Sequence, residues 1–392
     1  MKALVTDGSY SHTVGIVRYL AKEGVNVSVI GTSKLDIALH SRYCRKALLG
    51  PSPMLEEPYI KFLEQVLRDD SYDILIPVGY RAVEVIAKNK NRLRSFVNIE
   101  LPEYESIEIA LNKKKTYELA AKLGIPYPET VYPQDFDEVE GLSHKLEYPV
   151  VIKGLFEAGK QVVAYPRNRG EFINMYREMC DENHFGVGQL PMVQEYIGRG
   201  CNTSLAALYQ NGSCKRVFVY EGIRCFPLEG GSSSCARSIY DQEVIEHGTK
   251  LLDALNWHGV ADVEFKKGGG NNDLKLMEIN PKFYATVELA LRAGVNFPRD
   301  LCGMAIGKEL EYSEDYRRGL KYQYPFSKEL YHVREQPASI FNVINDFFNP
   351  RVKSNIWLSD FKPNFIELMF GLAALLPTRI RALLKRVARF EK

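Results

Sequence analysis

Two carboxylates and an amide stand on two expected strands that a glycine-rich loop joins, residues 260–265 and 274–280. Because side chains alternate between the faces of a strand, folding this hairpin brings Glu264 opposite Glu278, within about one residue of register. Like charges facing each other are unfavourable unless a cation lies between them. Oxygen ligands of this kind suit Mg²⁺, with Mn²⁺ as an alternative ion, so Glu264, Glu278 and Asn280 are predicted metal ligands. The competing interpretation is a solvated strand face with lysines nearby.

Three further elements fit a nucleotide. Lys113 opens an expected helix over residues 112–122, and Lys153 ends an apolar strand over residues 149–153. A lysine is costly in such a strand unless it meets an anion, so both lysines are candidates for phosphate contacts. The extended segment 193–198 precedes a bend, and its backbone could bind the edge of an adenine. The alternatives are a solvated Lys113, a Lys153 whose charged end reaches water, and an ordinary strand end.

The elements that must position these residues begin with alternating strands and helices in residues 1–110. Strands are expected at residues 3–5, 25–30 and 73–77, with helices at 13–23 and 82–88. This βαβ order predicts a parallel sheet, with a ligand at the carboxyl ends of the strands, near residues 8–12 and 77–81. The first loop lacks a full G-x-G-x-x-G, which argues against an oxidoreductase that binds a dinucleotide there.

The rest of the chain changes character twice, so the predicted fold class is α/β with α+β parts. Residues 111–195 contain a helix and a hairpin of strands 149–153 and 161–165 around Gly159-Lys160. Residues 196–310 are expected to be antiparallel strands with a turn at Asn211-Gly212. Residues 311–392 are irregular and then helical. The predicted domains are therefore 1–110, a Rossmann-like parallel-sheet domain, then 111–195, 196–310 and the C-terminal extension 311–392.

Composition narrows the class of protein further. The chain has 392 residues, is 45% hydrophobic and 26% charged, and balances 51 basic against 49 acidic residues. A net charge of +2 argues against a protein that coats nucleic acid, so no nucleic-acid partner is expected. No apolar run approaches the length of a membrane span, and the first residues do not resemble a signal peptide. The seven cysteines include no C-x-x-C pair, which predicts reduced thiols in a cytoplasmic protein rather than a zinc site or a disulfide framework.

These elements resemble the ATP-grasp superfamily in their order and spacing over about residues 1–300. Gly124-Ile125-Pro126-Tyr127-Pro128 follows Lys113, and the segment Met277-Glu278-Ile279-Asn280-Pro281 is the most specific match. Gly159-Lys160 before a strand and the run of residues 229–233 are similar to the carbamoyl-phosphate-synthetase-like carboxylate–amine ligases. The resemblance implies a pre-ATP-grasp domain over 1–110, a small lobe over 111–195 and a large lobe over 196–310.

The resemblance also implies an ATP-dependent ligase that joins a carboxylate to an amine through an acylphosphate, with Mg²⁺. Lys113 and Lys153 would contact the phosphates, and the adenine would be held by Gln194, Glu195, Tyr196 and Ile197. Asn202 stands where the family often has an acid for the ribose, and Lys282 where it often has an arginine. Lysine keeps the charge but lacks the fork geometry of arginine.

The substrate side of the site is less clearly marked by the sequence. Candidates for the γ-phosphate and the substrate carboxylate are Lys282, Arg237 and Arg224, and the two arginines could equally be surface strand residues. The flexible turn with Gly230, Gly231 and Ser232 could approach an acylphosphate, and Ser11 and His12 could meet the second substrate. A loop histidine with satisfied hydrogen bonds is the alternative for His12. The partners expected are small-molecule carboxylates and amines, and the sequence is compatible with a homodimer. The alternative function is a nucleotide-binding sensor or scaffold without ligase turnover.

The C-terminus lies outside the resemblance. Residues 378–389 predict a helix with Ile380, Leu383, Leu384 and Val387 on one stripe, and residues 378–392 contain six basic residues and one acid. Residues 365–376 just before it are apolar but too short to span a bilayer. A basic amphipathic helix suits an anionic membrane surface, which would make the protein peripheral at the inner membrane surface. The alternative, which we favour from the sequence alone, is that residues 366–376 pack on the core.

Overall fold

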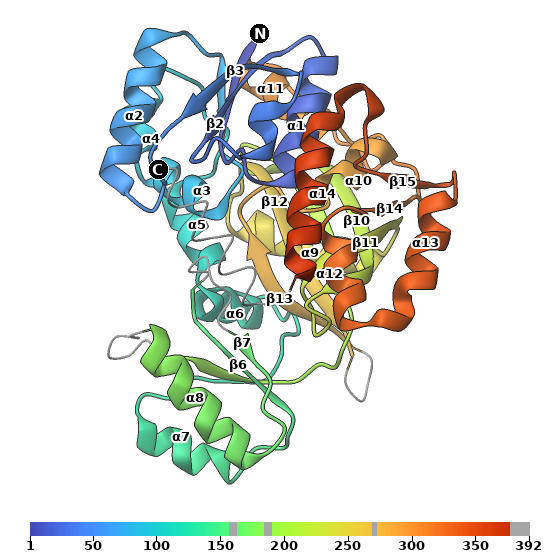
Figure 1. The fold of residues 1–392 in the computed structure, drawn as a ribbon. Helices are drawn as coiled ribbons and strands as arrows, with labels where there is room; N and C mark the ends of the chain where they lie inside the picture. The colour runs from blue at the N-terminus through green and yellow to red at the C-terminus, as the bar shows by residue number, and fades with distance from the viewer. Residues whose placement is uncertain (157–162, 184–189, 269–272, 377–392) are drawn as a thin grey trace.

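The computed structural model describes residues 1–156, 163–183, 190–268 and 273–376, and Figure 1 shows their arrangement. The parallel N-terminal sheet, a central sheet of seven strands and a small lobe make up most of these residues. The small lobe, with α7 and α8, extends away from the other two sheets in Figure 1. The α/β fold class predicted from the sequence is confirmed.

Residues 1–110 form a four-stranded parallel sheet of order β3-β2-β1-β4, as the βαβ alternation predicts. Its strands are β1 (Lys2–Val5), β2 (Asn26–Gly31), β3 (Cys44–Leu49) and β4 (Ile74–Ile76). Its helices are α1 (Ser11–Lys22), α2 (Glu56–Asp69), α3 (Tyr80–Lys88), α4 (Lys90–Leu93) and α5 (Tyr104–Leu111). The sequence pattern did not indicate β3 and α2. β3 is an edge strand that buries none of its side chains fully, so its sequence shows no apolar run.

The central sheet has the strand order β13-β12-β9-β10-β11-β14-β15 and is antiparallel apart from the last pair. Its strands are β9 (Thr203–Gln210), β10 (Ser213–Phe226), β11 (Ser232–Ile239), β12 (Gly259–Lys267), β13 (Leu274–Asn280), β14 (Lys321–Gln323) and β15 (Val352–Ser354). Asn211 and Gly212 both have positive φ, 51° and 76°, as a tight hairpin turn between β9 and β10 requires. The predicted antiparallel region and its turn are therefore confirmed.

The small lobe is a four-stranded sheet with two helices on it. The sheet has the order β5-β8-β6-β7. Its elements are β5 (Thr130–Val131), α7 (Phe136–Ser143), β6 (Val150–Lys153), β7 (Val163–Ala164), α8 (Arg169–Asn183) and β8 (Met192–Glu195). β6 and β7 pair antiparallel, which confirms the predicted hairpin, while Gly159-Lys160 between them lies outside the described residues. Helix α6 (Lys113–Lys122) precedes this lobe, and the side chain of Asn112 caps its first turn.

The core shows how these parts are joined. One face of the N-terminal sheet packs with α1 and with helices α10 (Val287–Ala293) and α11 (Phe297–Ala305) against the central sheet. The opposite faces share a second core with α3 and α9 (Gln242–Ala254). The small lobe instead has a core of its own, around Phe172 and Tyr176. The first domain and the central sheet are thus packed as one body, and the small lobe is attached to it.

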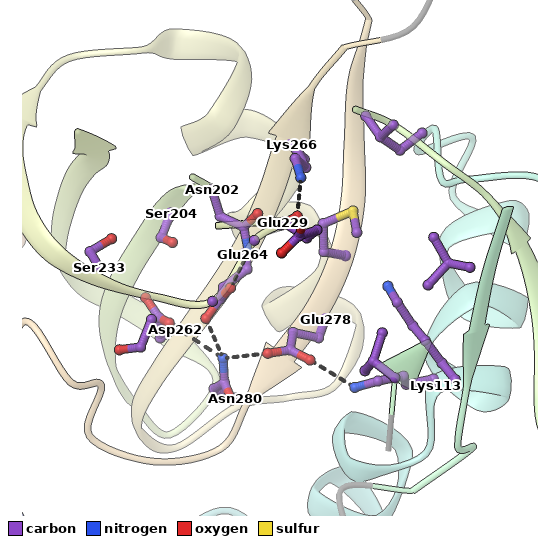
Figure 2. Close-up of a pocket in the computed structure, with 18 of the residues that line it drawn as sticks. Lys113, Asn202, Ser204, Glu229, Ser233, Asp262, Glu264, Lys266, Glu278 and Asn280 are labelled. Carbon is purple, nitrogen blue, oxygen red and sulfur yellow. Dashed lines mark hydrogen bonds and ion pairs between the residues drawn. The ribbon is translucent and has the colours of Figure 1, made fainter. Parts of the chain in front are cut away.

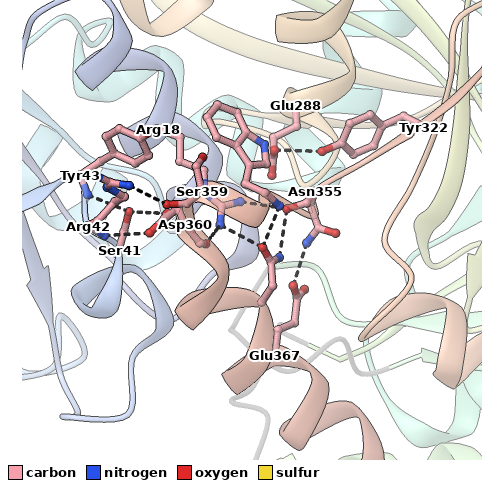
Figure 3. A network of polar contacts seen from close by, with 12 residues as sticks. Arg18, Ser41, Arg42, Tyr43, Glu288, Tyr322, Asn355, Ser359, Asp360 and Glu367 are labelled. Carbon is pink, nitrogen blue, oxygen red and sulfur yellow. Dashed lines mark hydrogen bonds and ion pairs between the residues drawn. The ribbon is translucent and has the colours of Figure 1, made fainter. Parts of the chain in front are cut away.

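The C-terminal segment returns to the N-terminal domain through a buried polar network (Figure 3). It contains α12 (Lys328–Glu335), α13 (Ile340–Phe348) and α14 (Phe361–Leu375). Arg18 of α1 donates from Nε to Asp360 Oδ2 at 2.9 Å, and both side chains are almost fully buried. Ser41 and the backbone of Arg42 also donate to the carboxylate of Asp360. These contacts fix residues 355–364 on the first domain, a long-range link that the sequence pattern did not suggest.

Helix α14 packs on the rest of the protein in a way that the sequence analysis did not anticipate. Its inward residues include Asn364 and Glu367, whereas Phe365, Met369 and Leu372 are exposed. Residues 366–376 therefore do contact the core, but much of their apolar surface does not. The predicted basic helix over residues 378–389 lies outside the described residues.

Candidate active site

The hairpin that the sequence singled out forms with the expected register. Strands β12 and β13 are antiparallel neighbours, and Glu264 pairs directly with Glu278, while Asp262 pairs with Asn280. A bulge follows between Glu264 and Phe265. Alternation along the two strands therefore places four polar side chains together at one point of the sheet, as Figure 2 shows.

A cavity of about 230 Å³ opens over this hairpin, between the central sheet and the small lobe. It is lined by most of the residues that the sequence analysis selected. These are Lys113, Lys153, Gln194, Glu195, Tyr196, Ile197, Asn202, Gly230, Gly231, Ser232, Glu264, Glu278, Asn280 and Lys282. Residues separated by more than 160 positions in the chain are thus brought to a single cavity.

One wall of the cavity is acidic. The side-chain amide of Asn280 donates to Glu264 at 3.0 Å and to Asp262 and Glu278 at 3.4 Å. Asn202 also donates to Glu264. Burial, together with the charges of Glu278 and Asp262, raises the pKa of Glu264 well above its ordinary value. Burial likewise raises the pKa of Asp262 to about 7. The wall therefore crowds carboxyl groups whose ionised forms repel one another unless protons or a cation neutralise them.

The facing wall is basic. Lys113 Nζ lies 2.7 Å from Glu278 Oε2, and Lys153 Nζ donates to Gln194 Oε1 at 3.0 Å. Although burial alone would raise the pKa of Glu278, Lys113, Lys282 and Lys153 hold it down at about 2. Burial and the charge of Lys113 lower the pKa of Lys153 to about 8. A buried lysine without a carboxylate partner is costly, and an anion in the cavity would offset that cost.

The acidic wall has the chemistry of a hard-cation site. Mg²⁺ prefers carboxylate oxygens, and the repulsion between the carboxylates would fall if a divalent cation were bound. Asn280 would ligate such an ion through its amide oxygen, in place of the NH2 group that now donates to the carboxylates. Among the described residues, no group of three or more His, Cys, Asp and Glu side chains is placed so that it could hold a metal ion by itself. An open set is what Mg²⁺ uses when it shares its ligands with substrate phosphates. The residues Glu264, Glu278 and Asn280 thus fit such an ion.

The segment that joins β8 to the central sheet forms the end of the cavity toward the small lobe. Glu195 accepts the backbone N–H of Glu129 at 2.7 Å and pairs with Lys275 of β13. The ring of Tyr196 stands edge-on to that of Tyr165, 5.9 Å between centroids, and both line the cavity. These contacts tie the segment to both lobes and leave an aromatic surface facing the cavity.

Two predicted arginines lie elsewhere. Arg224 is buried in an ion-pair cluster, with its guanidinium 2.8 Å from both Glu329 and Asp346. Arg237 pairs across β10 and β11 with Glu221, and its side chain is half exposed. Neither arginine lines the cavity. The structure therefore does not bring these two arginines to the predicted substrate position, because each forms ion pairs with carboxylates that lie next to it in the fold.

Ser11 and His12 also lie outside the residues that line the cavity. The hydroxyl of Ser11 donates to Glu367 of α14 at 2.7 Å, and the ring of His12 stacks on Tyr10. Burial and the charges of Lys328 and Lys282 lower the pKa of His12 well below its ordinary value. At the carboxyl edge of the first sheet, where a ligand was expected, Ser11 thus contacts the C-terminal segment instead.

Two residues that line the cavity, and one that contacts its wall, were not singled out from the sequence. Asp262 could have been found, because it shares a strand face with Glu264 two residues away. Lys266 is also on that strand and donates to the backbone of Glu229 at 2.8 Å. Lys328 gave no sequence signal. Its Nζ donates to Ser232 Oγ at 3.2 Å, and burial and the charge of Lys282 lower its pKa to about 8.

Comparisons with known proteins agree with this geometry. Residues 229–325 match the family described as "ATP-grasp in the biosynthetic pathway with Ter operon". The carbamoyl phosphate synthase large chain of Thermoanaerobacter sp. (strain X514) is 25% identical over 247 residues, which are 60% of this chain and 22% of that protein. The match therefore spans about a fifth of this relative's length.

Solved structures show the same fold at low sequence identity. The biotin carboxylase domain of Hydrogenobacter thermophilus 2-oxoglutarate carboxylase, solved with MgADP and bicarbonate, aligns with a TM-score of 0.64 and 18% identity over 82% of this chain and 73% of that chain. An L-amino acid ligase from Bacillus licheniformis aligns with a TM-score of 0.64 and 15% identity over 82% and 78%.

Proposed function

We propose that this chain, an ATP-grasp protein related to the carboxylate–amine ligases, uses ATP to join a carboxylate to an amine. The observation that carries the proposal is the pairing of Glu264 with Glu278 on one wall of a cavity whose other wall presents Lys113 and Lys153. A nucleoside triphosphate has the matching chemistry. Its phosphates are neutralised by lysine side chains and by a metal ion that acidic residues of the protein also bind.

In this proposal the nucleotide lies between the small lobe and the central sheet. Lys113 and Lys153 neutralise phosphate oxygens, and the segment 194–197 holds the adenine. Asn202 is positioned for a sugar hydroxyl, although in the structure its amide donates to Glu264. Glu264, Glu278 and Asn280 would hold Mg²⁺, which would neutralise phosphate charge when bound. The separate core of the small lobe is consistent with a lobe that closes on the nucleotide.

The carboxylate substrate is proposed to bind beside Lys282 and Lys328. Lys282 lines the cavity two residues after Asn280, and Lys328 donates to Ser232 and to the backbone of Ser233 on the cavity wall. The hydrogen bonds of Lys328 go to neutral oxygens, so its charge is not cancelled by a direct carboxylate partner in these contacts. A carboxylate held there would complete the pairing.

The proposed reaction has two steps. A carboxylate oxygen of the substrate attacks the γ-phosphorus, and the bond between that phosphorus and the leaving ADP oxygen breaks. The amine nitrogen then attacks the acyl carbon, a C–N bond forms, and the C–O bond to phosphate breaks, while the nitrogen loses a proton to the released phosphate. The protein contributes by positioning the reactants and by neutralising charge at the transferred phosphoryl group, which Lys282 can reach from the cavity wall.

The experiment is a phosphate-release screen over carboxylates and amines with ATP and Mg²⁺, run beside thermal-shift measurements with ATP and with NAD. A melting temperature raised by ATP but not by NAD is expected, because a ligand of the native state stabilises it. Glu278→Ala should abolish phosphate release while the protein stays folded. Glu246→Ala, an exposed carboxylate on α9, is the matched control.

The outcomes separate the proposed ligase from a nucleotide-binding sensor. ATP binding without phosphate release for any substrate pair would favour the sensor. Release by Glu278→Ala at the rate of the unmodified protein would remove Glu278 from the metal-binding role.

A further inference from the structure

Helix α14 buries its polar side chains and exposes many of its apolar ones, which is the reverse of the usual arrangement. Asn364 is 1% exposed and Glu367 is 5% exposed, whereas Phe365 is 51%, Met369 50% and Leu372 45% exposed. A surface helix of a water-soluble domain normally buries its apolar stripe and exposes its polar one. The outward face of α14 is therefore an apolar surface that water alone does not favour.

The inward face of α14 explains why the helix cannot simply rotate. Glu367 accepts hydrogen bonds from Ser11, Ser327 and Asn355, each at 2.7 Å. Asn364 accepts from Arg18 at 3.0 Å and donates to the backbone of Asn355. Turning the apolar face inward would leave these buried polar groups without partners, which is costly. The orientation of the helix is thus held by its polar contacts.

The helix also approaches its neighbour too closely to shift. A Cβ built on Gly371 would lie 2.1 Å from the carbonyl oxygen of Phe326, so only glycine fits there. This close contact lies on the inward side, near the C-terminal end of α14. Phe361, Phe365, Met369, Leu372 and Leu376 then follow one another at spacings of three or four residues along the outward side.

Charge indicates what covers this face. Glu367 is the only acidic residue of α14, and it is buried, while the exposed Lys362 stands near the start of the helix. The chain that follows, residues 377–392, carries six basic residues and one acid. The helix thus presents an apolar stripe without exposed acidic residues, and basic residues follow it in the sequence. This combination is complementary to a surface with an apolar interior and an anionic outer layer.

We propose that the outward face of α14 binds an anionic lipid membrane surface. The apolar side chains enter the interface between headgroups and acyl chains, and the anionic headgroups attract the basic residues that follow α14 in the sequence. None of the helices in the described residues is long and apolar enough to cross a bilayer, so α14 lies along the surface. The proposal does not depend on the ligase activity.

The test is co-sedimentation of the full chain with vesicles. Binding is expected to vesicles of phosphatidylglycerol and phosphatidylcholine in equal parts, to weaken as salt is added, and to be much weaker with phosphatidylcholine alone. The double variant Phe365→Ser with Met369→Ser should lose about tenfold or more in binding, since two large apolar side chains no longer enter the interface. Lys385→Gln with Arg386→Gln should weaken binding to the anionic vesicles only.

The matched control is Phe341→Ser with Phe348→Ser on α13, where the two side chains are 79% and 76% exposed. This control should bind as the unmodified protein does, because α13 is not continuous with the basic segment. Equal losses for the two double variants would overturn the assignment to α14. Equal binding to neutral and anionic vesicles, or no binding to either, would overturn the lipid partner. A dimer in sedimentation velocity that Phe365→Ser with Met369→Ser converts to monomers would assign the face to a second copy instead.

Discussion

Replacing Arg18 by methionine should destabilise the protein more than any substitution of an exposed arginine. Arg18 donates to the side chain of Asp360 at 2.9 Å and to its backbone at 2.7 Å, and also to Asn355 O at 2.9 Å and Asn364 Oδ1 at 3.0 Å. Its guanidinium carbon lies 5.1 Å from the centre of the Trp357 ring. Methionine fills similar space but supplies none of these hydrogen bonds.

The magnitude follows from what the variant leaves behind. The carboxylate of Asp360 would remain buried, held by Ser41 Oγ at 2.7 Å and the backbone N–H of Arg42 at 2.8 Å, without its cation. Removing one partner of a buried ion pair typically costs ~3–5 kcal/mol, so we expect a loss of about 4 kcal/mol in the free energy of unfolding. In a chain of this size that corresponds to a melting temperature lower by roughly 4–6 °C.

The assay is urea denaturation followed by tryptophan fluorescence, because Trp357 packs directly against Arg18 and the chain has only one other tryptophan, Trp257. The variant Arg18→Met with Asp360→Asn is the informative comparison. It leaves neither charge of this ion pair buried without its partner, so it should cost less than Arg18→Met alone. A loss below ~1 kcal/mol for Arg18→Met, or a double variant as unstable as the sum of the two singles, would refute the reasoning.

Three further predictions concern the cavity and its surroundings. Lys153→Ala should weaken ATP binding in calorimetry by about tenfold or more, because a buried cation no longer meets the phosphates, and an unchanged affinity would contradict the phosphate role. Lys328→Met should raise KM for the carboxylate at least several-fold and leave ATP affinity unchanged. The control is Lys267→Met, which replaces an exposed lysine paired with Asp241 and should change neither value. Equal effects of Lys328→Met on both substrates would remove Lys328 from the carboxylate site. Burial raises the pKa of Glu288 from 4.5 to about 7, so the folded state binds its proton more tightly than the unfolded chain does. The stability that this gives is fully present below the unfolded pKa and is lost as pH rises through about 7. Glu288→Gln, which can still accept from Tyr322, should therefore gain up to ~3 kcal/mol relative to the unmodified protein between about pH 5 and pH 8, measured as melting temperature against pH. A stability difference independent of pH would show that folding does not shift the pKa of Glu288.

Local pattern was sufficient for the parts of the site that depend on neighbours in sequence. The pairing of Glu264 with Glu278 follows from the period of a strand and the length of one loop, both of which are visible in the chain. The parallel first sheet follows in the same way from alternating strands and helices. Lys153 stood out because a charge at the end of an apolar strand requires a partner.

Only the tertiary structure decided which distant groups meet. Arg224 and Lys328 are both basic residues without a distinctive local pattern, yet one is neutralised by Glu329 and Asp346 and the other reaches the cavity wall at Ser232. The same holds for α14, whose apolar composition suggested a buried helix. Its polar residues find partners 356 positions away at Ser11, and those hydrogen bonds decide which face turns inward. Periodicity shows that a helix has two faces, but the contacts available elsewhere in the fold determine which face is buried.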